Sequence, residues 1–409
     1  MKQGYKETEL GWIPNNWTVS KLDAIGVFFK GKGVPKIQIT DEGFNCLTYG
    51  DLYTKYDVII KNVKSFISKE VTITSQEIKY GDICFSGSGE TLKEIGKCAV
   101  YLEKEPGYAG SDIIIFRGSQ EPLALSYILN STVVNRQKYK YGQGHSVVHI
   151  YSSQLKNLQI PLPPLPEQKA IAHCLSIWDK TIESQTKLIK AKEKRKKALM
   201  QQLLTGKKRL SGFTEGWKEF SYSQLIKQVT RKEQWDDSKI YNLISVKRRS
   251  GGIFARQSLY GRQIEVKQLV KVKENDFLIS KMQIVHGASS IVRKEFEDYY
   301  VSGSYVILNI KDENVLTPFY LDYMSKQKIF YHQTYIASYG VHIEKMTFDF
   351  KSFLKMKITL PSLLEQEKIT KIIDTAEKEI QIEKQKLADL QKQRKGLMQQ
   401  LLTGKVRLL

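Results

Sequence analysis

Apolar side chains recur at alternating steps of four and three residues in two long stretches of the chain. One stretch lies between Gln168 and Thr205, the other lies between Gln366 and Thr403, and neither contains proline. Spacing of this kind, sustained over several heptads and interrupted by a few polar residues that can fix register, predicts two long helices packed on each other. The positions expected to pair are Ile171, Leu175, Trp178, Ile182, Ile189, Leu199 and Leu203 in the first helix, and Ile369, Ile373, Ile380, Leu387, Leu390, Leu397 and Leu401 in the second.

Signals at both ends of each stretch agree with this interpretation. A proline-containing entry with a glutamate in the first turn precedes each stretch, and a glycine, Gly206 or Gly404, follows its end. The alternative is two separate amphipathic helices, each lying on its own domain.

The two stretches are copies of one element. The nine residues Leu199 to Lys207 recur letter for letter 198 positions later, as Leu397 to Lys405. At the same offset, the segment Ile160 to Gln168 aligns with Ile358 to Gln366, although the second copy contains fewer prolines. Internal self-similarity at a fixed distance indicates a duplicated architecture.

The segments that precede the helices resemble each other only faintly. Tyr80 to Ser86 is echoed by Glu274 to Ser280, and Trp17 is echoed by Trp217. Short apolar runs bounded by turn residues predict a mixed domain with a curled sheet in each half. The expected division is a first domain at 1–160, a helix segment at 161–211, a second domain at 212–357 and a second helix segment at 358–409.

The repeated sequence motifs resemble those of the specificity subunit of type I restriction-modification enzymes. They are Pro161 to Gln168 and Leu203 to Lys207, each present once per half, together with the opening Glu9 to Trp17, and the resemblance covers the whole chain. It implies an α+β fold in which two mixed α/β target-recognition domains are joined by two long antiparallel coiled-coil helices, with a pseudo-two-fold internal repeat.

The same resemblance implies partners and a task. Each variable domain would read one half of a bipartite asymmetric site in double-stranded DNA. The helices would set the gap between the halves and dock two methyltransferase (M) subunits, and nuclease/translocase (R) subunits would join through the complex. Such a chain acts in DNA methylation and bacterial defence without a catalytic centre of its own.

Charge supports a polyanionic partner. The chain has 64 Lys and Arg against 43 Asp and Glu, a formal charge of +21, on an otherwise globular composition with 22 Tyr. Such a surplus favours nucleic acid over a membrane surface. No apolar run approaches the ~18 residues that a membrane span needs, and the start lacks the apolar core of a secretion signal, so a cytoplasmic location is expected. The four cysteines show no paired spacing and are expected to be reduced packing residues.

Motifs for catalysis are absent from the sequence. There is no Asn/Asp-Pro-Pro-aromatic turn of an amino-methyltransferase and no phosphate loop of a translocase. His145 and His149 lie four apart without the intervening glutamate of a zinc-hydrolase helix, so no metal site is expected. We therefore expect no cofactor and no catalysis from this chain alone.

Loops that combine glycine, basic residues and amides are the candidates for DNA contact. Arg and Lys pair with guanine edges, Asn and Gln pair with adenine edges, and glycine lets the backbone approach the groove. For any single residue, a phosphate contact or a solvated surface position remains the alternative. The candidates are Ser88, Lys93, Lys140, Gln143 and His145 in the first domain, and Lys247, Arg248, Arg249, Lys281, Gln283, His286, Tyr339 and His342 in the second.

Two other functions remain open at this point. One is a coiled-coil scaffold with two protein-binding domains, for which the basic charge would be incidental. The other is a nuclease, which needs clustered carboxylates that the sequence does not reveal. DNA binding that weakens steeply with salt separates the first of these from a DNA reader.

Overall fold

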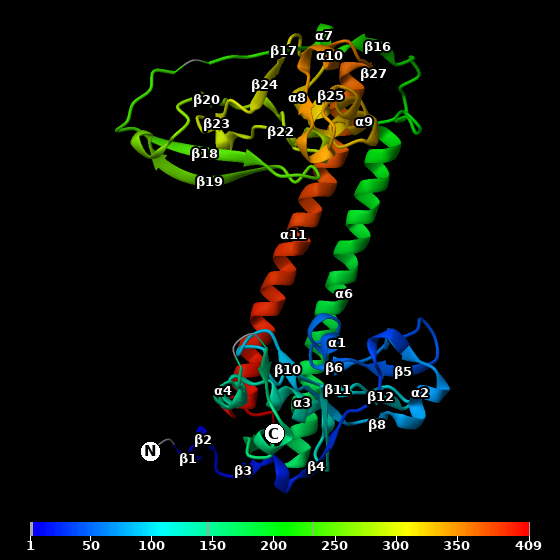
Figure 1. Ribbon diagram of the computed structural model, residues 1–409, viewed down its shortest axis with the longest axis vertical. Coiled ribbons are helices and arrows are strands. Elements are labelled where there is room, and N and C mark those ends of the chain that lie inside the picture. Colours follow the sequence, from blue (N-terminus) through cyan, green and yellow to red (C-terminus); the bar gives the residue numbers. More distant parts are fainter. Residues whose placement is uncertain (1–2, 145–146, 232, 409) are drawn as a thin grey trace. The chain divides into compact units, whose positions relative to one another are not determined.

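The computed structural model describes residues 3–144, 147–231 and 233–408. They form two compact units, unit 1 (Met1–Thr186 with Gln385–Leu409) and unit 2 (Lys187–Lys384). The division crosses both long helices, α6 (Leu165–Leu203) and α11 (Leu363–Leu402), so each unit holds one globular domain and part of each helix (Figure 1).

The helices run antiparallel where they meet in each unit. In unit 2 the Glu193 carboxylate lies 2.7 Å from the Lys384 ammonium, and Met200 shares a core with Ile373. In unit 1, Leu175 shares a core with Leu401. The prediction of a packed helix pair is confirmed, and two independent helices are excluded. Every position expected to pair is buried or partly buried.

The central sheet of unit 1 has five strands, and its middle strands are buried on both faces. Side chains alternate along β9, so that Ile83 and Phe85 join the core that contains the helices, while Cys84 joins a second core on the other face. The strand order is β4 (Gly26–Lys30), β13 (Ile113–Gly118), β9 (Ile83–Ser86), β11 (Cys98–Tyr101) and β6 (Ile59–Ile60).

Unit 1 has a second sheet and several shorter elements. The second sheet has the order β7 (Phe66–Ile67), β5 (Phe44–Leu47), β12 (Gly107–Ala109) and β8 (Gln76–Ile78). The remaining strands pair as β1 (Tyr5–Thr8) with β2 (Gly11–Pro14), β3 (Thr18–Lys21) with β15 (Gln159–Leu162), and β10 (Ser88–Gly89) with β14 (Val148–His149). The short helices are α1 (Tyr49–Thr54), α2 (Lys69–Thr74), α3 (Pro122–Leu129), α4 (Thr132–Tyr141) and α5 (Ser152–Leu155).

Unit 2 repeats the strand order of both main sheets, except that its described residues contain no counterpart of β6. Its first sheet has the order β17 (Ile226–Gln228), β24 (Tyr305–Ile310), β21 (Phe277–Ser280) and β22 (Ser289–Ile291). Its second has the order β19 (Ile253–Tyr260), β18 (Ile240–Val246), β23 (Tyr300–Ser302) and β20 (Leu269–Lys271). In both second sheets the middle pair is parallel and the outer pairs are antiparallel.

The remaining elements of unit 2 also match those of unit 1. Strand β16 pairs with β27 as β3 pairs with β15, and α8 and α9 follow the central sheet as α3 and α4 do. The bounds are β16 (Lys218–Ser221), β27 (Lys357–Leu360), β25 (Ser338–Tyr339), β26 (Thr347–Phe348), α7 (Tyr222–Leu225), α8 (Pro318–Met324), α9 (Lys328–Ile336) and α10 (Phe350–Leu354).

The same ion pair fastens the start of each long helix to the segment after the end of the other. The Arg209 guanidinium donates to both carboxylate oxygens of Glu365, at 2.7 and 2.8 Å, and Arg407 makes the same two contacts with Glu167. We call these pairs the clasps. Both glutamates are buried, so the glutamate predicted in the first turn of each helix anchors that helix to the segment after the other helix.

Candidate nucleic-acid interface

In unit 2 the turn between β18 and β19 rests on the loop that follows β21. The backbone N–H of Arg249 donates to the His286 carbonyl at 2.7 Å, and that of Ser250 donates to the Gly287 carbonyl at 3.0 Å. Gly287 has a φ of +75°, and a Cβ there would lie 2.2 Å from the Tyr331 ring, so only glycine permits this approach. The turn and the loop therefore present one continuous surface.

A polar network joins three segments on this surface. The Arg248 guanidinium donates to the Gln283 side-chain oxygen and, at 2.9 Å, to the Glu344 carboxylate. Nε2 of His286 lies 3.2 Å from the same carboxylate. Arg248 and Glu344 are about half exposed, and exposed pairs of this kind stabilise a fold by only about 0–1 kcal/mol. The network links the three segments and by itself contributes little to stability.

The other second-domain candidates surround this network. The backbone N–H of Phe348 donates to the Lys281 carbonyl at 3.0 Å, while the Lys281 ammonium donates to the Gly303 carbonyl at 3.0 Å. Tyr339 is exposed and pairs with Thr347 across the β25–β26 ladder, next to Met282. Lys247, Arg249 and His342 are exposed at loop positions. Sequence positions as far apart as 248 and 344 thus meet on one face.

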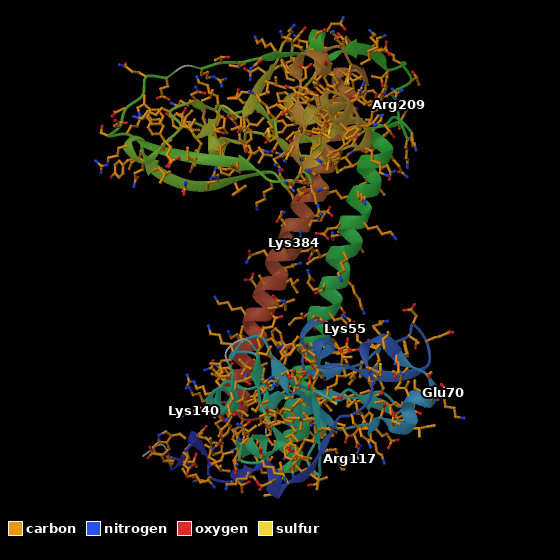
Figure 2. The ribbon with its side chains drawn as sticks, viewed as in Figure 1. Lys55, Glu70, Arg117, Lys140, Arg209 and Lys384 are labelled. Atoms are coloured by element: carbon orange, nitrogen blue, oxygen red, sulfur yellow. The ribbon has the colours of Figure 1, made fainter. Side chains whose placement is uncertain are left out.

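The candidates of unit 1 lie in the matching loops. The backbones of Gln143 and His149 exchange two hydrogen bonds, which fasten the loop after α4 to β10 and β14. Lys93, Lys140 and Gln143 are exposed, and Lys140 lies at the end of α4 (Figure 2). His145 lies outside the described residues.

Ser88 faces the protein in this structure. It is 4% exposed, its hydroxyl lies 3.0 Å from Nδ1 of His149, and its carbonyl accepts from the Tyr53 hydroxyl. Ser88 therefore positions the loop for its neighbours. The sequence placed it in a glycine-rich loop because Gly87 and Gly89 flank it, but the short β10–β14 pairing buries it.

Lys138 is a residue that the sequence reasoning missed. It is fully buried in α4 and donates to the Gly96 carbonyl at 2.8 Å, and burial lowers the pKa of its ammonium. This contact ties the 90–97 loop, which carries Lys93, to the helix that carries Lys140. A lysine two residues before Lys140, in a helix rich in polar and basic residues, gives no sequence signal for such a role.

Exposed apolar side chains were also missed, and they border both loop clusters. Apolar groups on a DNA-facing surface can contact the thymine methyl group or wedge between base steps. Their residue types carry no polar signal, so the search for basic and amide residues passed over them. They are Leu92, Val147 and Tyr151 in unit 1, and Met282, Val341 and Ile343 in unit 2.

Other kinds of site find no support in the described residues. Within them, no three His, Cys, Asp or Glu side chains gather as a metal site would require. Over the same residues, no helix is long and apolar enough to cross a membrane. Cys46, Cys84, Cys98 and Cys174 are all free thiols, and burial raises the pKa of Cys46 to about 12, which makes it an unreactive packing residue.

Comparison with known proteins gives consistent matches. The family model of the type I restriction modification DNA specificity domain matches residues 14–193 and again residues 214–392. The putative type I restriction enzyme MjaX specificity subunit of Methanocaldococcus jannaschii is 29% identical, over 99% of this chain and 97% of the relative. The MjaVIII specificity subunit of the same organism is 24% identical, over 99% of this chain and 96% of the relative.

Solved structures share the fold. The S subunit of a type I restriction-modification system from M. genitalium superposes with a TM-score of 0.56 at 16% identity, covering 94% of this chain and 96% of the other. A chain from a study of complex assembly and conformational transition of the type I R-M system gives 0.58 at 16% identity, covering 96% and 99%. Because the family model matches most of the chain in two consecutive copies, the chain belongs to the type I restriction-modification DNA specificity family, whose members are the non-catalytic specificity subunits of these enzymes.

Proposed function

We propose that each unit reads one half of a bipartite asymmetric site in double-stranded DNA. The observation that carries this proposal is that one sheet frame, repeated in both units apart from β6, bears two different clusters of exposed basic, amide and apolar side chains. A shared frame with different loops supports two readers of one kind of ligand with two different sequences. The formal charge of +21 supports a polyanionic ligand.

Within unit 2, Arg248 and Gln283 are the side chains best suited to base contact. A guanidinium can pair with the O6 and N7 of guanine, and a side-chain amide can pair with the N6 and N7 of adenine. In the free protein the two side chains are hydrogen-bonded to each other, so both are already held near the loop surface. On binding, their mutual contact is exchanged for contacts with base edges.

We propose that the long helices bind the partner subunits. The repeated helix segments offer two similar surfaces, which suit two copies of one methyltransferase subunit, and nuclease/translocase subunits join through that complex. The helices also set the gap between the half-sites. Each is 39 or 40 residues long, or about 60 Å at ~1.5 Å per residue.

Domain exchange tests the reading of two half-sites. Residues 212–357 are replaced by the corresponding domain of a relative, and methylated sites are mapped in cells that carry the matching methyltransferase. One half of the methylated sequence should change and the other should stay. A change in both halves would show that the domains do not read independently.

Two measurements test the role proposed for the helices. Native mass spectrometry of the reconstituted complex should show two methyltransferase subunits per chain, and saturation at one copy would contradict the docking proposal. Insertion of one heptad into both helices keeps the seam in register and adds about 10 Å, or roughly three base pairs of gap. Methylation at the original gap would show that the helices are not the spacer.

A further inference from the structure

A basic groove lies in unit 2 where the helices meet the globular domain. It has a volume of about 680 Å³ and is lined by both helices, by the start of α9 and by Ser250 in the β18–β19 turn. Six lysines and two glutamates contribute to its wall. We call it the junction groove, and Lys384 on its wall is labelled in Figure 2.

Three of these lysines are neutralised within the protein. Lys384 lies 2.7 Å from Glu193, Lys196 pairs with Glu377, and Lys326 lies 2.7 Å from the buried Asp322. The other three are Lys197, Lys207 and Lys328, which are exposed and make no ion pair among the described residues. The groove therefore carries positive charge that the protein itself leaves uncompensated.

The junction groove continues the surface proposed to read DNA. Ser250 belongs to the groove wall and is the neighbour of Arg249, and its backbone N–H is bound to Gly287 of the reading loop. Arg249 and Lys247 are exposed in the same turn. A DNA backbone that extends from the reading loops would meet Arg249 and Lys247 first and then the three unpaired lysines of the groove.

Unit 1 differs from unit 2 at the matching positions of its own helices. The first residue of α4 is Thr132 where α9 begins with Lys328, and Thr186 stands 198 positions before Lys384. Lys395 and Lys405 do repeat Lys197 and Lys207. Two of the three unpaired lysines, Lys197 and Lys207, are thus repeated in unit 1, whereas threonines stand at the positions that match Lys328 and Lys384.

We propose that the junction groove binds the sugar-phosphate backbone of DNA beside the half-site that unit 2 reads. This inference rests on the proposed function, because it extends the DNA path from the reading loops to the helices. Lys197, Lys207 and Lys328 contact phosphates and carry no sequence information. A backbone contact of this kind strengthens binding to every DNA sequence and makes binding more sensitive to salt.

Salt dependence of DNA binding tests the inference in the reconstituted complex with the methyltransferase. Each phosphate contact contributes about 0.9 to the slope of log affinity against log salt concentration. The K197Q/K207Q double variant should lower the magnitude of the slope by about 1.8, and adding K328Q should bring the decrease to about 2.7. The mapped methylation sequence should stay the same.

The repeat supplies a matched control. The K395Q/K405Q variant removes the matching two lysines of unit 1, where Thr132 and Thr186 replace Lys328 and Lys384, and should leave the slope unchanged. The arginine variant K197R/K207R/K328R should retain the full slope, because the charges remain. Equal slope loss in the K395Q/K405Q control would overturn the assignment to the junction groove.

Other outcomes also separate the possibilities. An unchanged slope in the triple glutamine variant would overturn the inference. If native mass spectrometry also shows loss of methyltransferase subunits from that variant, the groove is a protein-docking surface. An altered methylation sequence would assign base contact to the groove and overturn it too. Absence of salt-dependent DNA binding by the unmodified complex would instead contradict the proposed function.

Discussion

The two units share one structural frame and differ in the side chains that their loops expose. In both clasps an arginine donates two hydrogen bonds to a buried glutamate in the first turn of a long helix. In unit 2 the arginine lies in the segment that leads into the second domain, and in unit 1 it lies near residue 409. What is repeated is the frame that orients the loops, and what differs is the loop surface.

The clasps differ in one detail that alters their strength. In unit 1 the indole N–H of Trp17 donates to Glu167 at 2.9 Å, so the buried carboxylate has two side-chain donors. In unit 2 the indole N–H of Trp217 finds no acceptor among the described residues, and the Arg209 guanidinium lies 5.8 Å from the centre of its ring. Glu365 therefore depends on Arg209 more than Glu167 depends on Arg407.

The largest effect is expected from breaking the unit 2 clasp. Arg209→Ala leaves the buried carboxylate of Glu365 without a side-chain donor among the described residues, and an uncompensated buried charge is strongly destabilising. Arg407→Ala should cost less, because Trp17 still donates to Glu167. Hydrogen exchange at the start of α11 and of α6 reports each clasp separately. Equal loss of protection in the two variants would show that the indole contributes nothing.

A second contrast concerns the glycine after each long helix. Gly206 and Gly404 have φ values of +68° and +66°, so alanine at either position costs about 1–2 kcal/mol. A Cβ at Gly404 would also lie 2.4 Å from the Pro14 ring, whereas one at Gly206 would lie 3.3 Å from Trp217. Overpacking should add about 1–3 kcal/mol for Gly404→Ala alone. Thermal unfolding of the two variants checks the order, and a larger loss for Gly206→Ala would contradict it.

A smaller effect than that of Gly404→Ala is expected from the tyrosines that bind one long helix to each domain. Tyr127 donates to Asp179 and Tyr323 donates to Asp374 at 2.5 Å, and in both cases burial, followed by the carboxylate, raises the pKa of the hydroxyl. Tyr323→Phe should cost about 1.5–3 kcal/mol, the usual worth of a hydrogen bond to a charged group.

Tyr127→Phe provides the comparison for that prediction. Its loss should be smaller, because Arg394 lies 2.6 Å from Asp179 and still compensates the carboxylate. Denaturant unfolding of both variants measures the difference, provided that the slope of unfolding free energy against denaturant concentration is the same in both. A larger loss in Tyr127→Phe would mean that Arg394 does not stabilise Asp179.

Local periodicity was sufficient to predict much of the frame. The four-and-three spacing identified both helices, because a long helix imposes its period on every residue that faces its partner. The letter-for-letter repeat identified two equivalent halves, and the tokens that flank it identified the family. The net charge of +21 favoured a polyanionic ligand. These properties are local or additive, so they can be read along the chain without knowing which segments meet.

Only the tertiary structure decided which loop residues share a surface. Arg248 meets Gln283 and Glu344 because β18, β21 and η6 (Ile343–Lys345) converge there, although the residues lie 35 and 96 positions from Arg248. Ser88 is buried by a two-residue strand pairing, and the clasps join residues 156 and 240 positions apart. Contacts of this length depend on how sheets and helices pack together, and neither propensity nor periodicity of a single segment encodes them.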